Sequence, residues 1–194
     1  MRSAEILRET GETRISLRLV IDGEGKRSID TCIGFFDHMI DLFARHGLFD
    51  IALSVKGDTR VDEHHTIEDT GIVLGEAFAK AAGDKAGICR YATQFVPMDE
   101  TLAFASVDFS GRAYLAYSAA CPDETVGGVT AQIFEEFFRA FAMGARITLH
   151  TGVLYGANTH HMIEAVFKAV ARALRFALEA DPRCSGIPST KGIL

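Results

Sequence analysis

Residues 62–69 read DEHHTIED, and residues 157–165 read ANTHHMIEA. A His-His pair followed by two residues and a glutamate therefore occurs twice, and His160 lies 96 positions after His64. Apolar residues follow each copy at helical spacing and at the same offset, namely Ile67, Gly71, Leu74, Phe78 and Ala81, then Ile163, Phe167, Val170, Leu174 and Ala177. This 4-3-4-3 spacing is typical of the buried face of an amphipathic helix. The sequence therefore predicts two equivalent helices from a duplicated unit.

The start of each predicted helix is also duplicated. Asp62 and Asn158 each precede a His-His pair by two positions. Aspartate and asparagine are favoured N-cap residues because their side-chain oxygens accept hydrogen bonds from the first free amides of a helix. Both histidine pairs are thus expected in the first helical turn.

The repeat extends upstream of the two histidine pairs. Residues 36–44 (FDHMIDLFA) and 134–142 (FEEFFRAFA) predict short helices, and residues 49–55 and 146–155 predict strands. Residues 14–33 and 101–119 each predict a β-hairpin, with turns at residues 22–25 and near residues 110–111. Each half then reads strand, strand, helix, strand, helix, and the fold class is α+β with sheets covered by helices.

We expect one domain, residues 1–194, made of two repeats at about residues 1–87 and 88–194. Residues 84–100 are predicted to connect the repeats, because they contain Gly87 and Pro97 and lack clear periodicity. The last fourteen residues, DPRCSGIPSTKGIL, are rich in turn-forming residues and predict a closing tail.

Composition narrows the class of protein. The chain has 194 residues, 48% of them hydrophobic, which is enough to bury a core. No apolar run is long enough to span a bilayer, and the N-terminus lacks the apolar segment of a signal peptide, so a cytoplasmic protein is expected. The four cysteines form no CxxC pair and are expected to be reduced thiols. The net charge of −6 argues against nucleic-acid binding, and membrane association is not expected.

The duplicated histidines indicate a metal site. His64 and His65 point about 100° apart around a helix axis, so adjacent histidines suit two metal ions better than one. Glu68 lies one turn from His64. Two copies supply four imidazoles and two carboxylates, a donor set that fits manganese, iron or zinc. A single motif of this kind is more often a solvated helix start, and duplication can copy residues without function. The matched caps and stripes favour a metal site.

Six ordered motifs extend the comparison to a known family: FFDHM, DEHHTIEDTGIVLGEA, PMDE, DFSGR, HHMIEAVFKAVARALR and IPSTKG. Together they resemble the imidazoleglycerol-phosphate dehydratase family over nearly the whole chain, from about Arg14 to Leu194. The resemblance implies dehydration of D-erythro-imidazole-glycerol phosphate to imidazole-acetol phosphate in histidine biosynthesis. It implies two Mn²⁺ ions per active site and a ribosomal protein S5 domain 2-like fold. It also implies a homo-oligomer of twenty-four subunits with active sites between subunits.

The resemblance also implies the metal ligands. One ion would be held by His38, His64, Glu68 and His160, and the other by His65, Glu136, His161 and Glu164. The family often has a histidine where this chain has Glu136, and the repeat aligns Glu136 with His38. We expect Glu136 to be a ligand, with a surface glutamate and a water ligand as the alternative. His150 is expected to be structural or to support a ligand.

Further residues match the substrate-contacting positions of the family. They are His46, Arg90, Arg112, Lys168, Ser189 and Lys191. For the cations the alternative is an ordinary surface charge, and for His46 it is a helix-terminal histidine bonded to carbonyls. Glu12 resembles the acid/base residue near C2 of the substrate. From the sequence alone it is a carboxylate at a strand edge.

Two other classes of protein remain possible from the sequence. One is another dimetal enzyme, such as a phosphoester hydrolase, on the same scaffold. The other is a metal-storage or shell protein without catalysis. Neither accounts for PMDE, SGR and PSTKG accompanying the histidines.

Overall fold

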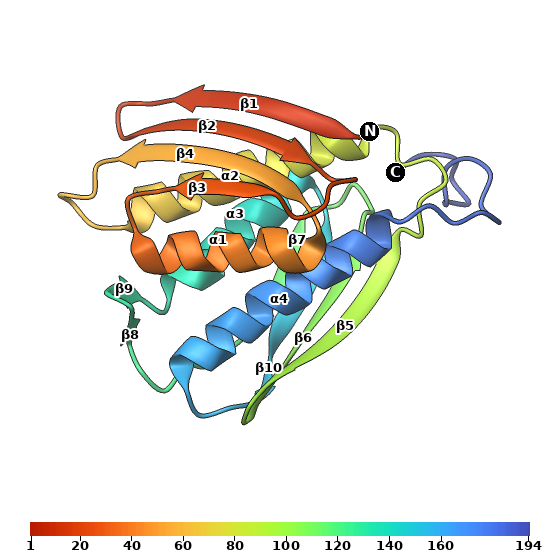
Figure 1. Ribbon diagram of the computed structural model, residues 1–194. Coiled ribbons are helices and arrows are strands. Elements are labelled where there is room, and N and C mark those ends of the chain that lie inside the picture. Colours follow the sequence, from red (N-terminus) through yellow and green to blue (C-terminus); the bar gives the residue numbers. More distant parts are fainter.

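The structure, a computed structural model, describes all 194 residues as two four-stranded sheets with four helices between them (Figure 1). The first half contains β1 (Ser3–Glu9), β2 (Thr13–Val20), β3 (Arg27–Asp30), α1 (Gly34–Gly47), β4 (Asp50–Gly57) and α2 (His64–Ala82). The second half contains β5 (Tyr91–Met98), β6 (Thr101–Asp108), β7 (Tyr114–Ser118), β8 (Thr125–Val126), β9 (Val129–Thr130), α3 (Ile133–Ala145), β10 (Thr148–Tyr155) and α4 (Thr159–Leu178). The predicted α+β class with two similar halves is confirmed.

The two sheets have the same topology. Their strand orders are β1-β2-β4-β3 and β5-β6-β10-β7, and β8 and β9 form a separate small ribbon. In each sheet the last strand pairs in parallel with its neighbour, β3 with β4 and β7 with β10. A parallel pair needs a crossover connection, and α1 and α3 lie in those two crossovers. All other pairs in the two sheets are antiparallel.

The helices form a middle layer that both sheets share. Helix α2 packs on β1 and β2, and α4 packs on β5 and β6. Across the layer, α2 contacts α3 and α1 contacts α4. All ten residues of the two predicted stripes are buried. The middle layer therefore brings side chains of the first half against side chains of the second.

Both predicted hairpins are wrong. Residues 14–33 hold β2 and β3, which do not pair with each other, because β4 lies between them. In the same way β10 separates β6 from β7 within residues 101–119. The turn after β2 is instead fixed by Asp50 at the start of β4, whose Oδ1 accepts hydrogen bonds from the amides of Glu24 and Lys26. The strand that intervenes comes later in the chain, so local turn residues do not reveal it.

The prediction that residues 84–100 are only a connection is also wrong, because they contain β5. This strand forms the outer edge of the second sheet and pairs only with β6. Proline is tolerated at such an edge, where its missing N–H is not needed by a second neighbour. Pro97, taken as a sign of a connection, is therefore compatible with an edge strand.

The helix starts differ between the halves. Asn158 caps α4, and its side chain accepts hydrogen bonds from the amides of His160 and His161. Asp62 accepts from the His64 amide at 2.8 Å, but α2 begins at His64, and its N-cap residue is Glu63. Asp62 therefore lies one position before the cap, and the two histidines are the first two residues of α2.

Helices α2 and α3 approach closely because glycines face one another. A Cβ added to Gly75 would lie against the carbonyl oxygen of Phe141 and 2.7 Å from the nitrogen of Ala145. A Cβ added to Gly144 would lie 2.6 Å from the carbonyl oxygen of Ile72. Both obstacles are backbone atoms, which cannot move aside without shifting a helix. No helix is both long and apolar enough to cross a bilayer.

The variant Gly75→Ala is expected to lower the free energy of unfolding by about 1–3 kcal/mol, because overpacking forces α2 and α3 apart. Gly34→Ala is the matched control, since nothing lies within 4 Å of a Cβ at this helical glycine. Urea denaturation at one fixed protein concentration measures both. Equal stability of the two variants would contradict the close helix contact.

Candidate metal and substrate site

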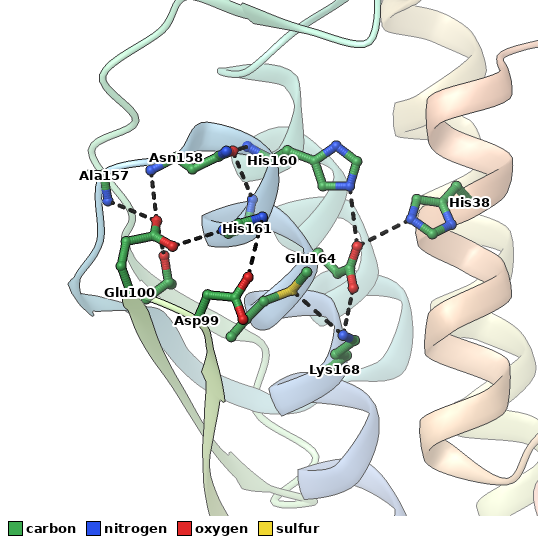
Figure 2. Close-up of polar contacts among 11 residues, drawn as sticks. His38, Asp99, Glu100, Ala157, Asn158, His160, His161, Glu164 and Lys168 are labelled. Atoms are coloured by element: carbon green, nitrogen blue, oxygen red, sulfur yellow. Dashed lines mark hydrogen bonds and ion pairs between the residues drawn. The ribbon is translucent and has the colours of Figure 1, made fainter.

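One cluster of candidate metal ligands joins the two halves of the chain (Figure 2). His38 comes from α1, and His160 and Glu164 come from α4. The Nε2 atoms of His38 and His160 lie 3.1 and 3.2 Å from Glu164 Oε2. One ligand atom from each residue falls within 4.8 Å of the others. The α1–α4 contact thus places two imidazoles and a carboxylate where one cation can reach all three.

Glu164 is charged at neutral pH although it is buried. Its side chain is 8% exposed, and Lys168 Nζ lies 2.5 Å from Oε1. Burial alone would raise the pKa of Glu164, but hydrogen bonding and charge from Lys168, followed by His38 and His160, hold this pKa below its usual value. Lys168 Nζ also contacts the sulfur of Met98. A negative ligand oxygen is therefore available in the cluster.

The first His-His motif lies beside a different pair of helices. His64 Nε2 is 3.5 Å from Glu68 Oε2, one turn further along α2. His64 and Glu136 of α3 line one pocket of about 260 Å³, together with Asp62 and Glu63. Within one chain, Glu136 therefore lies near His64, whereas the resemblance groups it with His65, His161 and Glu164. The pocket is rich in carboxylates, which suits a cation.

The second histidine of each motif lies between two carboxylates. His65 Nδ1 is 3.0 Å from Asp58, and His65 Nε2 is 3.7 Å from Glu12. His161 Nδ1 is 2.8 Å from Glu100, and its Nε2 is 3.9 Å from Asp99 (Figure 2).

Hydrogen bonding governs the protonation of these two histidines. The hydrogen bond that His65 donates to Asp58 raises the pKa of His65, and the one that His161 donates to Glu100 raises the pKa of His161. The same contact with His161 holds the pKa of Glu100 below its ordinary value.

Four of the six predicted substrate-binding residues line one cavity. Arg90, Arg112, Ser189 and Lys191 surround about 780 Å³ at the C-terminal tail. Arg90 is already engaged, because its guanidinium pairs with Asp108 and donates to the Pro188 carbonyl at 2.7 Å. Arg112 is 67% exposed, and its shortest distance to a carboxylate is 3.8 Å. Arg112 thus has donors free for an anion, while Arg90 holds the tail in place.

The other two predicted substrate contacts lie near the α1–α4 cluster. Lys168 contacts Glu164, and His46 is close enough to Lys168 and Arg172 to feel their charges. Burial first, and then these cations, lower the pKa of His46. His150 is exposed, and its ring centre lies 5.9 Å from that of Tyr114.

The donor chemistry fits a metal ion, but one chain does not bring the eight predicted ligands together. Only His38, His160 and Glu164 form a group of ligand size. Imidazole nitrogen with carboxylate oxygen suits manganese, iron or zinc. No role was predicted for Asp58 or Glu100. The PMDE motif ends at Glu100 and could have drawn attention to it, whereas nothing in the sequence marks Asp58.

Comparisons with known proteins agree with one another. The family model described as imidazoleglycerol-phosphate dehydratase matches residues 31–174. Imidazoleglycerol-phosphate dehydratases of Caldanaerobacter subterraneus subsp. tengcongensis and Bacillus pumilus are each 58% identical over 194 residues, covering 100% of both chains.

Solved structures show the same similarity. The crystal structure of imidazoleglycerol-phosphate dehydratase from Staphylococcus aureus has a TM-score of 0.84 and 40% identity, covering 92% of this chain and 99% of that one. The structure of IGPD from Pyrococcus furiosus in complex with (S)-C348 has a TM-score of 0.84 and 34% identity, covering 97% and 100%.

The variant Lys168→Met, studied in metal-stripped protein, is expected to lower the free energy of unfolding by about 3 kcal/mol at pH 7, because it leaves a buried carboxylate without its cation. The pKa of Glu164 is lowered on folding, so the stabilisation that Lys168 provides is fully present above the ordinary, unfolded pKa of 4.5 and is lost as the pH falls through the folded pKa.

The difference in free energy of unfolding between wild type and Lys168→Met should therefore be smaller at pH 4 than at pH 7. Urea denaturation at the two pH values measures it. Lys80→Met is the control, since Lys80 Nζ donates only to the Glu5 carbonyl. A difference in free energy of unfolding that is the same at both pH values would show that the Lys168–Glu164 ion pair does not cause it.

Proposed function

The chain belongs to the imidazoleglycerol-phosphate dehydratase family, and from this premise we propose that it converts D-erythro-imidazole-glycerol phosphate to imidazole-acetol phosphate and water in histidine biosynthesis. Such an enzyme is a carbon–oxygen hydro-lyase. The observation that carries the proposal is the convergence of His38, His160 and Glu164 on one point across the two halves of the chain. A substrate with an imidazole ring and a phosphate needs both a metal-binding region and an anion-binding region, and the chain has candidates for each.

The metal proposed is Mn²⁺, two ions per active site. His38, His64, Glu68 and His160 would hold one ion, and His65, Glu136, His161 and Glu164 the other. This assignment places Glu164 on a different ion from His38 and His160, whereas within one chain its Oε2 lies 3.1 and 3.2 Å from their Nε2 atoms, so the proposed site needs the two ions close together. Water as the fourth ligand in place of Glu136 is the alternative. A bound ion would act as a Lewis acid on an imidazole nitrogen of the substrate and favour the imidazolate form of the ring.

We propose that the complete site forms between subunits of a homo-oligomer of twenty-four chains. Two observations support this arrangement. His64 lies in a pocket with Glu136 of α3, and His160 contacts Glu164 beside His38 of α1, so the eight proposed ligands lie in separate places within one chain. The pocket beside His64 and the cluster beside His38 each hold part of a ligand set. A second copy of the chain can supply the missing part of each.

The phosphate of the substrate would bind in the cavity at the C-terminal tail. Arg112 offers free guanidinium donors, which can grip a phosphate in bidentate fashion. Ser189 and Lys191 lie in a tight turn in which Ser189 Oγ accepts from the Lys191 amide. Arg90 contributes by holding the Pro188 carbonyl next to that turn. Lys168 and His46 would approach the substrate from the metal-binding side.

The proton at C2 of the substrate needs a base, and we assign that role to Glu12. This residue lies in the turn between β1 and β2, with its side chain 55% exposed and 3.7 Å from His65 Nε2. Its carboxylate therefore borders the proposed metal region while staying open to a ligand. Electrons of the imidazole ring would expel the C3 hydroxyl, which takes up the proton lost from the ring nitrogen and leaves as water, and the C2–H bond becomes more acidic. Glu12 then takes the C2 proton, the C–H electrons form the C2=C3 double bond of the enol and restore the ring, and protonation at C3 gives the ketone.

Product analysis separates this function from its rivals. With imidazoleglycerol phosphate as substrate, imidazole-acetol phosphate is the expected product. Release of inorganic phosphate from that substrate or from generic phosphate esters would favour the phosphoester hydrolase. Tight metal binding without any turnover would favour the storage or shell protein.

The variant Glu12→Gln is expected to lower kcat by about 10²–10⁴-fold, because it removes a general base while keeping the size of the side chain. Manganese content, measured by elemental analysis, should not change. Glu9→Gln is the control, since Glu9 lies on the same hairpin and its carboxylate faces only Arg14, at 3.8 Å. Full turnover by Glu12→Gln with normal metal content would show that Glu12 is not the base.

A further inference from the structure

In each motif, Nδ1 of the second histidine contacts a carboxylate that lies outside the motif. Asp58 places both oxygens at His65 Nδ1, at 3.2 and 3.0 Å. Glu100 places Oε2 at His161 Nδ1, at 2.8 Å. We propose that Asp58 and Glu100 are positioning residues that keep the hydrogen of each imidazole on Nδ1 and so leave the Nε2 lone pair for the metal ion. This inference rests on the metal binding proposed above.

The tautomer follows from the nature of the partner. An ionised carboxylate only accepts hydrogen bonds, so a neutral imidazole facing it through Nδ1 must carry its hydrogen there. Its lone pair is then on Nε2, the atom that points away from the carboxylate. Ligating histidines commonly have such a partner, which fixes the ring orientation and raises the basicity of the ligand nitrogen. In both motifs the Nε2 side faces a more exposed carboxylate, Glu12 or Asp99, rather than the protein interior.

Duplication does not account for these contacts. Asp58 lies in the loop between β4 and α2, and the position 96 residues later is Leu154, on β10. Glu100 comes instead from the turn between β5 and β6. The two halves therefore reach the same contact from non-equivalent positions. A copied surface residue would occupy the same position in both repeats, so the shared geometry indicates a shared requirement at Nδ1.

Glu100 also fixes the start of the helix that carries His161 (Figure 2). Its Oε1 accepts from the amides of Ala157 and Asn158, at 3.2 and 2.9 Å. Asn158 in turn caps α4 through the amides of His160 and His161. Oε1 of Glu100 thus accepts from two backbone amides and the Thr101 hydroxyl, and Oε2 contacts the imidazole. Because the two oxygens have different partners, Glu100→Gln is an informative variant.

In Glu100→Gln, the amide oxygen is expected to stay on the two backbone amides, which need an acceptor. The NH₂ group then faces His161 Nδ1 and forces the imidazole hydrogen onto Nε2, where it blocks metal binding. Calorimetric titration of the metal-stripped protein with Mn²⁺ should show about 10–100-fold weaker binding at one of two sites. The melting temperature should stay near that of wild type. A purely structural role predicts the reverse, with Glu100→Gln keeping its affinity because the loop is intact.

Variants of Asp58 provide an independent test, because here the amide variant is expected to keep its Mn²⁺ affinity and the alanine variant to lose it. Asp58→Asn should keep most of the Mn²⁺ affinity, because both oxygens face the same nitrogen and the amide can turn its oxygen toward it. Asp58→Ala should bind Mn²⁺ about 10–100-fold more weakly at one site. Asp84→Asn is the control, since Asp84 accepts only from the Ala86 amide.

The outcomes separate this inference from the proposed function. If wild type binds Mn²⁺ and turns over, and Glu100→Gln and Asp58→Ala bind Mn²⁺ as wild type does, the positioning role is overturned and the dehydratase stands. If wild type neither binds Mn²⁺ nor forms product, the proposed function falls and this inference with it. Weakened binding in those two variants, with Asp58→Asn and Asp84→Asn near wild type, supports the positioning role.

Discussion

The contact between α1 and α4 is the constraint on which the rest of the arrangement depends. Each sheet has one apolar face that must be buried, and one layer of helices between the two sheets buries both faces. The shared layer sets His38 of the first half against Glu164 of the second. Burial of Glu164 beside Lys168 then places a charged carboxylate, a candidate ligand, in a partly dehydrated environment, where its attraction for a cation is stronger than in water.

Local periodicity predicted the helices well, because each has an apolar stripe that depends only on spacing along one segment. The sheet order could not be predicted in this way. Strand β2 pairs with β4 rather than with β3, and β4 begins only at Asp50, after both of the other strands. Strand β1 was not predicted, because Arg8 points inward and pairs with Asp69 of α2. An inward arginine breaks the alternation that identifies a strand.

The candidate site shows the same division between local and long-range information. The duplicated His-His motif indicated metal chemistry, since the residue types and their spacing on a helix already suit it. Which imidazole meets which carboxylate depends on helix crossings and turns, as in the approach of His38 to Glu164 and of Asp58 to His65. These pairings also explain why two adjacent histidines have different surroundings. The first faces a glutamate of its own helix, and the second is held by a carboxylate from a loop or turn.

Metal-dependent dehydration is tested most simply by titrating metal-stripped protein with Mn²⁺ and recording the turnover of imidazoleglycerol phosphate at each addition. We expect no product without metal and a rate that rises until two equivalents per chain are bound, and then stays constant. Full turnover by protein shown by elemental analysis to hold no metal would contradict this expectation, because the duplicated histidines and glutamates would then have no part in the reaction.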